Sequence, residues 1–208
     1  MLDLTTALSF FVTALLLGYA PGPDIVFVMA QSAVHGVRAG LATMTGLVTG
    51  LCFHTALVSL GLAALIKASP LAFLLIKTAG ALYLLWLAWL SWRASALQTH
   101  GEKPAFPGYL ALYRRGIVMN MTNPKVTMFF LALLPQFCDP ARGSIGWQCF
   151  SLGLIFMLAT VVAFSSVSVL SGRIFARFNR TAKGQVLLNK ACALIFVSLA
   201  VLLLVAEL

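Results

Sequence analysis

Long uncharged apolar runs constrain this chain more than any other feature of its sequence. Three of them cover residues 4–23, 39–66 and 143–172. A run of about 18 or more such residues is long enough to cross the hydrocarbon core of a bilayer. The chain is 61% hydrophobic and only 9% charged, whereas a soluble domain carries roughly 25% charged residues. We therefore expect an all-α membrane protein that crosses the lipid bilayer several times.

Several other classes of protein fit the composition poorly. The net charge of +9 could indicate a nucleic-acid partner, but the basic residues lie beside apolar segments without interleaved aromatic residues. The four cysteines lack the spacing of a metal site, and the three histidines and five acidic residues are scattered. We therefore expect no nucleic acid, metal, cofactor or enzymatic activity. The start, Met1-Leu2-Asp3, lacks the positive region of a cleavable signal peptide, so the first run is expected to remain as a span.

The hydropathy pattern predicts six spans, with five as the alternative. The predicted spans are 4–34, 39–66, 70–92, 116–137, 144–171 and 187–208. Shifting the first half by 101 residues places Pro23 on Pro124 and the second span on the fifth. This correspondence predicts a repeat of three helices, with a first unit over 1–92, a cytoplasmic linker over 93–113 and a second unit over 114–208.

The positions of the basic residues predict the orientation in the membrane. Counted in order, the first, third and fifth connections together hold most of the basic residues, from Arg38 in the first to Lys190 at the end of the fifth, whereas the other side holds only Lys67 and Arg142. The positive-inside rule places the basic connections in the cytoplasm and both termini outside, as for a multi-pass membrane protein. Three spans per unit then invert the second unit relative to the first.

The same orientation places Cys138 and Cys149 on either side of an external connection. Disulfide bonds persist in oxidising compartments, so a bond between these two residues is possible. The alternative is two small apolar residues at helix ends.

An interruption by proline and a charge divides the first span. Pro21 and Pro23 flank Gly22 and precede Asp24. Proline lacks an N–H and pushes the residue before it out of the helical conformation, so one helix must end near Pro21 while another can begin at Pro23. An ionisable side chain is costly within a bilayer and by default indicates a functional site. Gly22 and Asp24 are therefore candidate substrate-binding residues.

The fourth span repeats this arrangement at Asn123, Pro124 and Lys125. Asn123 suits a helix N-cap and Pro124 the first helical position, while Lys125 opposes the helix dipole. If the two units are inverted, both resumed helices start near the bilayer midplane, and their positive ends converge on a place suited to a carboxylate. Ordinary proline kinks and a structural ion pair between Asp24 and Lys125 remain alternatives.

Weaker candidates lie near these interruptions. Asn120 and His54 could line the substrate site, and His54 could instead relay protons or be a hydrogen-bonded packing residue. Gly46 and Gly50 are spaced for close helix packing, which we favour over a dimer seam, although a homodimer stays possible. Lys77 is expected to snorkel to the outer membrane interface.

Three motifs resemble the LysE/RhtB family of amino-acid exporters. They are Pro21-Gly22-Pro23-Asp24 in the first span, Gly80-Ala81-Leu82-Tyr83-Leu84-Leu85 in the third, and Asn120-x-x-Asn123-Pro124-Lys125 followed by Phe129-Phe130-Leu131-Ala132-Leu133-Leu134-Pro135-Gln136-Phe137 in the fourth. The chain resembles the branch for homoserine, homoserine lactone, threonine and leucine more than the lysine and arginine branch. The resemblance implies an inner-membrane secondary exporter driven by the proton motive force.

The expected function is export of a small neutral amino acid or derivative in exchange for protons. Lys125 and the converging helix ends would hold the substrate carboxylate, and Asp24 would either neutralise the ammonium group or carry the proton. Export of a metal or other cation is the main alternative, but it favours a cluster of intramembrane acids, and only Asp24 is present. A membrane-embedded enzyme or a structural protein is a further alternative.

Overall fold

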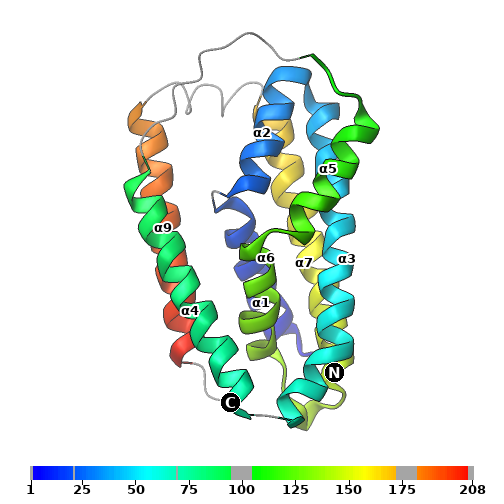
Figure 1. The fold of residues 1–208 in the computed structure, drawn as a ribbon, viewed down its shortest axis with the longest axis vertical. Helices are drawn as coiled ribbons and strands as arrows, with labels where there is room; N and C mark the ends of the chain where they lie inside the picture. Colours follow the sequence, from blue (N-terminus) through cyan, green and yellow to red (C-terminus); the bar gives the residue numbers. More distant parts are fainter. Residues whose placement is uncertain (1, 21, 69, 95–104, 172–181, 206–208) are drawn as a thin grey trace.

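The computed structural model describes residues 2–20, 22–68, 70–94, 105–171 and 182–205, and these residues form helices and no strand (Figure 1). In chain order the elements are α1 (Leu4–Tyr19), α2 (Pro23–His35), α3 (Val37–Ala68), α4 (Pro70–Arg93), α5 (Tyr109–Met121), α6 (Pro124–Met128), η1 (Phe129–Leu133), η2 (Leu134–Phe137), η3 (Pro140–Arg142), α7 (Ile145–Leu170) and α9 (Ala182–Val205). The element η1 is a π-helix, and η2 and η3 are 3-10 helices. The predicted all-α architecture is confirmed for this part of the chain.

Caps and glycine turns fix where several helices begin. Asp3 caps α1 by accepting a hydrogen bond from a backbone N–H of the first turn. Gly36 joins α2 to α3 with a φ of 88°, a left-handed conformation that glycine adopts without steric cost. Gly108 has the same φ of 88° immediately before α5. The helix α5 therefore begins directly after this turn, at Tyr109, which lies inside the segment 93–113 that we predicted to be a linker.

Helix length and composition give up to five membrane spans among the described residues. Three stretches are individually long and apolar enough: Val37–Gly61, Leu74–Arg93 and Ile145–Leu170. The other two are bent pairs, α1 with α2 at 62° and α5 with the segment Pro124–Phe137 at 47°. The predicted breaks in the first and fourth elements are therefore confirmed. The last predicted span corresponds to α9, whose apolar part within the described chain is the shorter helix Asn189–Val205.

Successive elements alternate in direction along the long axis of the molecule (Figure 1). The pair α1–α2 runs from the lower end of the view to the upper end, and α3 returns. The helix α4 runs upward, the α5–α6 pair downward, α7 upward and α9 downward. The beginning of α1 and the end of α9 consequently lie at the same end of the molecule.

The long helix α3 lies at the centre of one group of helices and packs against α2, α5 and α7. Its contact with α5 is so close that a Cβ atom added to Gly46 would lie 2.0 Å from the carbonyl oxygen of Tyr113. A Cβ atom added to Gly116, on α5, would lie 2.5 Å from the carbonyl oxygen of Thr43. Close approach through small residues is typical of membrane helices. The glycine spacing in α3 is thus used for packing within the chain, as we predicted.

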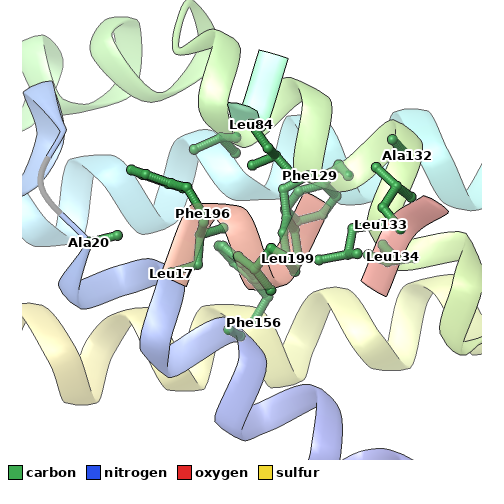
Figure 2. Packing of buried hydrophobic residues seen from close by; sticks show 14 of the residues in the cluster. Leu17, Ala20, Leu84, Phe129, Ala132, Leu133, Leu134, Phe156, Phe196 and Leu199 are labelled. Atoms are coloured by element: carbon green, nitrogen blue, oxygen red, sulfur yellow. The ribbon is translucent and has the colours of Figure 1, made fainter. Parts of the chain in front are cut away.

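The helices α4 and α9 form a second group and pack against each other (Figure 1). Apolar side chains from α1, α4, η1, η2, α7 and α9 meet in one buried cluster, part of which is seen in Figure 2. Large side chains there, such as Phe129, Phe130 and Phe196, are at most 2% exposed. This cluster fixes the positions of α1 and of the α6–η1 segment, which carry the two helix breaks.

Candidate functional site

The first break separates α1 from α2. Tyr19 is the last residue of α1, and the N–H of Ala20 bonds back to the carbonyl groups of Leu16 and Leu17. The next helix begins at Pro23, preceded by Gly22 in an extended conformation that supplies no side-chain cap. Pro21 lies outside the described residues. One helix therefore ends at Tyr19 and the next begins at Pro23, as we predicted from the two prolines.

The second break separates α5 from α6. Thr122 is the C-cap of α5, and the side chain of Asn123 accepts a hydrogen bond of 2.9 Å from the backbone N–H of Lys125. Pro124 occupies the first helical position, so the predicted N-cap is confirmed. The resumed helix is regular for only five residues and continues as the π-helix η1 and the 3-10 helix η2. Such irregular segments are frequent at functional sites and hinges.

Lys125 joins the two breaks. Its side chain, 6% exposed, extends from α6 to the end of α1, where Nζ donates hydrogen bonds to the carbonyl oxygens of Leu17 at 3.3 Å and Ala20 at 3.2 Å. The final carbonyl groups of a helix have no partners within it and carry its negative dipole end, so a cation is stabilised there. A Cβ atom added to Gly22 would lie 3.0 Å from Nζ. Glycine at this position leaves room for the lysine.

Asp24 lies in the first turn of α2, directly after the first break. Its side chain is 3% exposed and lies near the side chains of Asn123 and Asn120 and near the charge of Lys125. The carboxylate and Nζ of Lys125 are nevertheless not within the 4.0 Å of a direct ion pair. The two charges are therefore close enough to influence each other without forming a direct ion pair.

Three buried polar atoms around these charges have no hydrogen-bond partner. They are Oδ1 of Asp24, Oδ1 of Asn120 and Nδ2 of Asn123. A buried polar group without a partner costs about 1–3 kcal/mol, so such groups are few in folded proteins unless a ligand or water completes them. One oxygen of the buried anion, one amide oxygen and one amide NH₂ group thus lack partners in the vicinity of the buried cation, which suits a small zwitterionic ligand.

His54 borders this group from α3. The ring is 2% exposed and lies between the rings of Phe53 and Phe130, with centroids 5.6 Å away in each case. Its Nε2 is 3.2 Å from the carbonyl oxygen of Asn120, which also accepts a hydrogen bond from the backbone N–H of Asn123. His54 is thus a hydrogen-bonded residue that supports the turn between α5 and α6. Its contact is with the backbone of a candidate residue rather than with Asp24 or Lys125.

The structure brings together every predicted site residue that it describes and adds two groups that the sequence analysis missed. These are the carbonyl oxygens of Leu17 and Ala20. A signal was available, because the last carbonyl groups of a helix lack the regular partners four residues further along the chain. The expectation for Lys77 is wrong, since its side chain is only 8% exposed and does not snorkel. It lies on α4, which packs against α9 and η1.

Comparison with known proteins supplies an independent view. The LysE type translocator family matches residues 15–207. The homoserine/homoserine lactone efflux protein of Salmonella typhimurium is 35% identical over 195 residues, 94% of each chain. The leucine efflux protein of Klebsiella pneumoniae is 31% identical over 195 residues, 93% of this chain and 92% of that protein. An uncharacterized membrane protein of Vibrio cholerae is 33% identical over 207 residues, 99% of this chain and 100% of that protein.

No solved structure matches this chain. The matched residues include both helix breaks and all the candidate site residues described above. The matches also agree with the prediction of a transporter rather than an enzyme. The chain belongs to the LysE family of translocators.

Proposed function

We propose that this protein exports small neutral amino acids or their derivatives in exchange for protons. The observation that carries the proposal is the meeting of two helix breaks around Asp24 and Lys125, with unpaired polar atoms beside them. The relatives named for homoserine, homoserine lactone and leucine efflux support the substrate class. Neutral amino acids fit because the two charges can each satisfy one end of a zwitterion.

The substrate carboxylate binds Lys125 in this proposal. In this proposal the backbone N–H groups at the start of α2, which have no side-chain cap at Gly22, also contribute to binding the carboxylate. The substrate ammonium group pairs with Asp24 and donates to Oδ1 of Asn120. Nδ2 of Asn123 donates to the carboxylate, so that each unpaired polar atom acquires a partner.

Binding of the carboxylate also changes the contacts of the break. Lys125 now holds the carbonyl oxygens of Leu17 and Ala20, at the end of α1. When its ammonium group turns to the substrate, those carbonyl groups lose a donor and the angle between α1 and α2 is less tightly held. A substrate can shift a conformational equilibrium only through such a difference in contacts. Lys125 therefore links occupancy to the change of access.

Asp24 is the proposed coupling group. It is the acidic residue among the candidates, and it either binds the substrate ammonium group or carries a proton in its place. In one half of the cycle the substrate ammonium group neutralises the Asp24 carboxylate, and in the other half a proton does so. The buried carboxylate is therefore never left without a positive partner. This alternation gives antiport of amino acid and proton.

The proposed architecture is an inverted repeat of three plus three spans in the inner membrane, with both termini in the periplasm. It is supported by the alternating helix directions and by the position of the first α1 residues and the last α9 residues at one end (Figure 1). Arg38, in the first turn of α3, and Arg93, the last residue of α4, lie at the opposite end, as the positive-inside rule requires for cytoplasmic connections.

Efflux from preloaded membrane vesicles tests the function. Vesicles with the protein should release homoserine, homoserine lactone, threonine or leucine faster than vesicles without it. The release of lysine and arginine should be equal in the two kinds of vesicle. An imposed proton gradient should accelerate release, and a protonophore should abolish that acceleration. Failure to move any neutral amino acid, by protein that is monodisperse in detergent, would refute the proposal. Release that is indifferent to the gradient would refute the coupling alone.

A further inference from the structure

A second polar site lies at the end of the molecule that carries the N-terminus. The structure has there a cavity of about 340 Å³, bounded by the first turns of α1, the end of η2 and the beginning of α7. Ser9 and Gln136 are among its lining residues. Ser9 precedes Ala20 by eleven residues of the sequence. At a rise of 1.5 Å per residue, Ser9 is thus roughly 16 Å from the break along α1.

The cavity presents charges of both signs. Arg142 forms ion pairs with Asp3 and, through Nε at 3.0 Å, with Asp139. The backbone N–H of Thr6 and the Arg142 guanidinium lower the pKa of Asp3 to about 2, so this carboxylate is charged at physiological pH. Hydroxyl groups of Thr6 and Ser9 line the same cavity. A guanidinium, two carboxylates and hydroxyl groups in one hollow match both ends of an amino acid.

One wall of this cavity is held in place by Gln148. The side chain is 4% exposed, and its Nε2 donates hydrogen bonds to the carbonyl oxygens of Asp139 at 2.8 Å and Gly143 at 3.3 Å. Its Oε1 accepts a hydrogen bond of 2.9 Å from the backbone N–H of Asp139. The loop that carries Asp139 and Arg142 is therefore fixed by a buried amide, so the charged groups lie on a built wall.

A layer of contacting aromatic rings extends from this cavity toward the segment that follows the second break. Phe137 lines the cavity and meets the ring of Phe10 edge-on at 5.0 Å. Phe10 contacts Phe129 at 5.7 Å, and Phe129 contacts Phe156 at 4.9 Å, within the cluster of Figure 2. The N–H of Phe129 bonds to the carbonyl group of Lys125, one turn away. The rings on η1 and η2 belong to the irregular part of the broken span, which suits a segment that changes conformation.

We infer that this cavity is a second amino-acid subsite, on the side to which substrate is released. Arg142 holds the carboxylate of the departing amino acid, Asp3 and Asp139 hold its ammonium group, and the layer of Phe10, Phe129 and Phe137 closes the path to the central site. The inference rests on the proposed function, because it takes the ligand to be the exported amino acid.

Equilibrium binding to the purified, detergent-solubilised protein tests this subsite. Labelled homoserine and labelled leucine are the probes, each used in turn. At least one of them should bind at two sites per chain, one lost in Lys125→Gln and the other weakened about tenfold in Arg142→Gln. Ser9→Trp, which fills the cavity without removing a charge, should weaken the same site as Arg142→Gln. Arg38→Gln removes an arginine at the opposite end and should leave both sites unchanged.

The outcomes separate this inference from the proposed function. A single site that depends on Lys125 and is unaffected by Arg142→Gln and Ser9→Trp would overturn the subsite while leaving export intact. Two sites whose affinities are both unchanged in Arg142→Gln and in Ser9→Trp would also overturn it. A site that depends only on Arg142 and Ser9, in protein without efflux, would retain the subsite and refute the proposed central site.

Discussion

At the scale of single residues, the central site depends on what each buried charge contacts. Lys125 is held by two carbonyl oxygens at the end of α1, and Asp24 lies buried near two asparagines with Oδ1 unpaired. The two charges form no direct ion pair, but they are buried close enough for each to stabilise the other electrostatically. Removing one charge leaves a buried and uncompensated group, which commonly costs about 3–5 kcal/mol, whereas removing both can be nearly neutral for stability.

Neutral replacements of the two charges should therefore separate folding from transport. We expect Asp24→Asn and Lys125→Gln each to abolish efflux and to lower the amount of folded protein. The double variant should recover folding but not efflux, because the substrate carboxylate has lost its cation. Lys190→Gln is a matched control, since Lys190 is an exposed lysine that lies over the ring of Trp92.

Vesicle efflux and the elution profile in detergent check this prediction together. Wild-type transport by well-folded Lys125→Gln would show that the lysine only caps α1. A double variant less stable than either single variant would show that the two charges do not compensate each other.

At the scale of secondary-structure elements, the contact between α3 and α5 positions the second break. Small residues allow the two backbones to approach closely, and a Cβ atom on Gly50 would lie 2.7 Å from Cβ of Asn120. The same crossing places His54 against the carbonyl group of Asn120. The packing of these helices therefore determines where a candidate site residue lies.

Alanine at Gly46 should disturb this crossing. Its methyl group would lie 2.0 Å from a backbone oxygen that cannot move alone, and overpacking of this kind typically costs about 1–3 kcal/mol. Gly61→Ala, in the same helix, is the matched control because nothing lies within 4 Å of its added Cβ atom. Thermal unfolding in detergent should show a lower midpoint for Gly46→Ala and an unchanged or higher one for Gly61→Ala. Equal midpoints would contradict the role of this crossing.

The connection between η2 and α7 brings Cys138 and Cys149 together. Their sulfur atoms are 3.6 Å apart and both thiols are free in the structure, whereas a disulfide bond needs about 2.05 Å. Because the proposed topology places this connection in the oxidising periplasm, we expect the pair to become a disulfide there. Mass mapping of protein prepared without reductant should find the two residues linked. Two free thiols, with the same pair still free after treatment with diamide, would refute the expectation.

At the scale of the whole molecule, alternating helices place the ends of the described chain together (Figure 1). Basic residues lie at the opposite end of the molecule: Arg38 in the first turn of α3 and Arg93 at the end of α4. Outward-facing leucine and tryptophan side chains, such as Leu82 at 63% exposed and Trp86 at 50%, are suited to lipid contact. The proposed six crossings would account for these features together; helix length and composition identify three spans in the described part, or up to five if each bent pair is one span.

Reporter fusions test the six-span topology. Fusions at Ala96 and Lys183 should report the cytoplasm, and a fusion at Leu208 should report the periplasm, because the basic connections remain inside. Fusions at Ala96 and Leu208 that report the same compartment would contradict the six-span arrangement, since an odd number of spans would then be required.

Local chemistry allowed the sequence to predict both breaks and the ends of the helices beside them. Proline removes an N–H and restricts its neighbour wherever it stands, and Asn123 caps α6 through a bond to a residue only two positions away. Composition and apolar run length likewise indicated a helical membrane protein, because the bilayer leaves few ways to satisfy a backbone. The motifs around the breaks were specific enough to indicate the family.

Only the tertiary structure decided what the buried charges touch. The bond from Lys125 to Leu17 joins residues 108 positions apart, and its geometry depends on how α1, α6 and α9 pack around one apolar cluster. The same dependence explains the error for Lys77, since burial of a long side chain follows from neighbours on other helices. Local rules act within a few residues, whereas the distance between two breaks is set by the packing of the whole bundle.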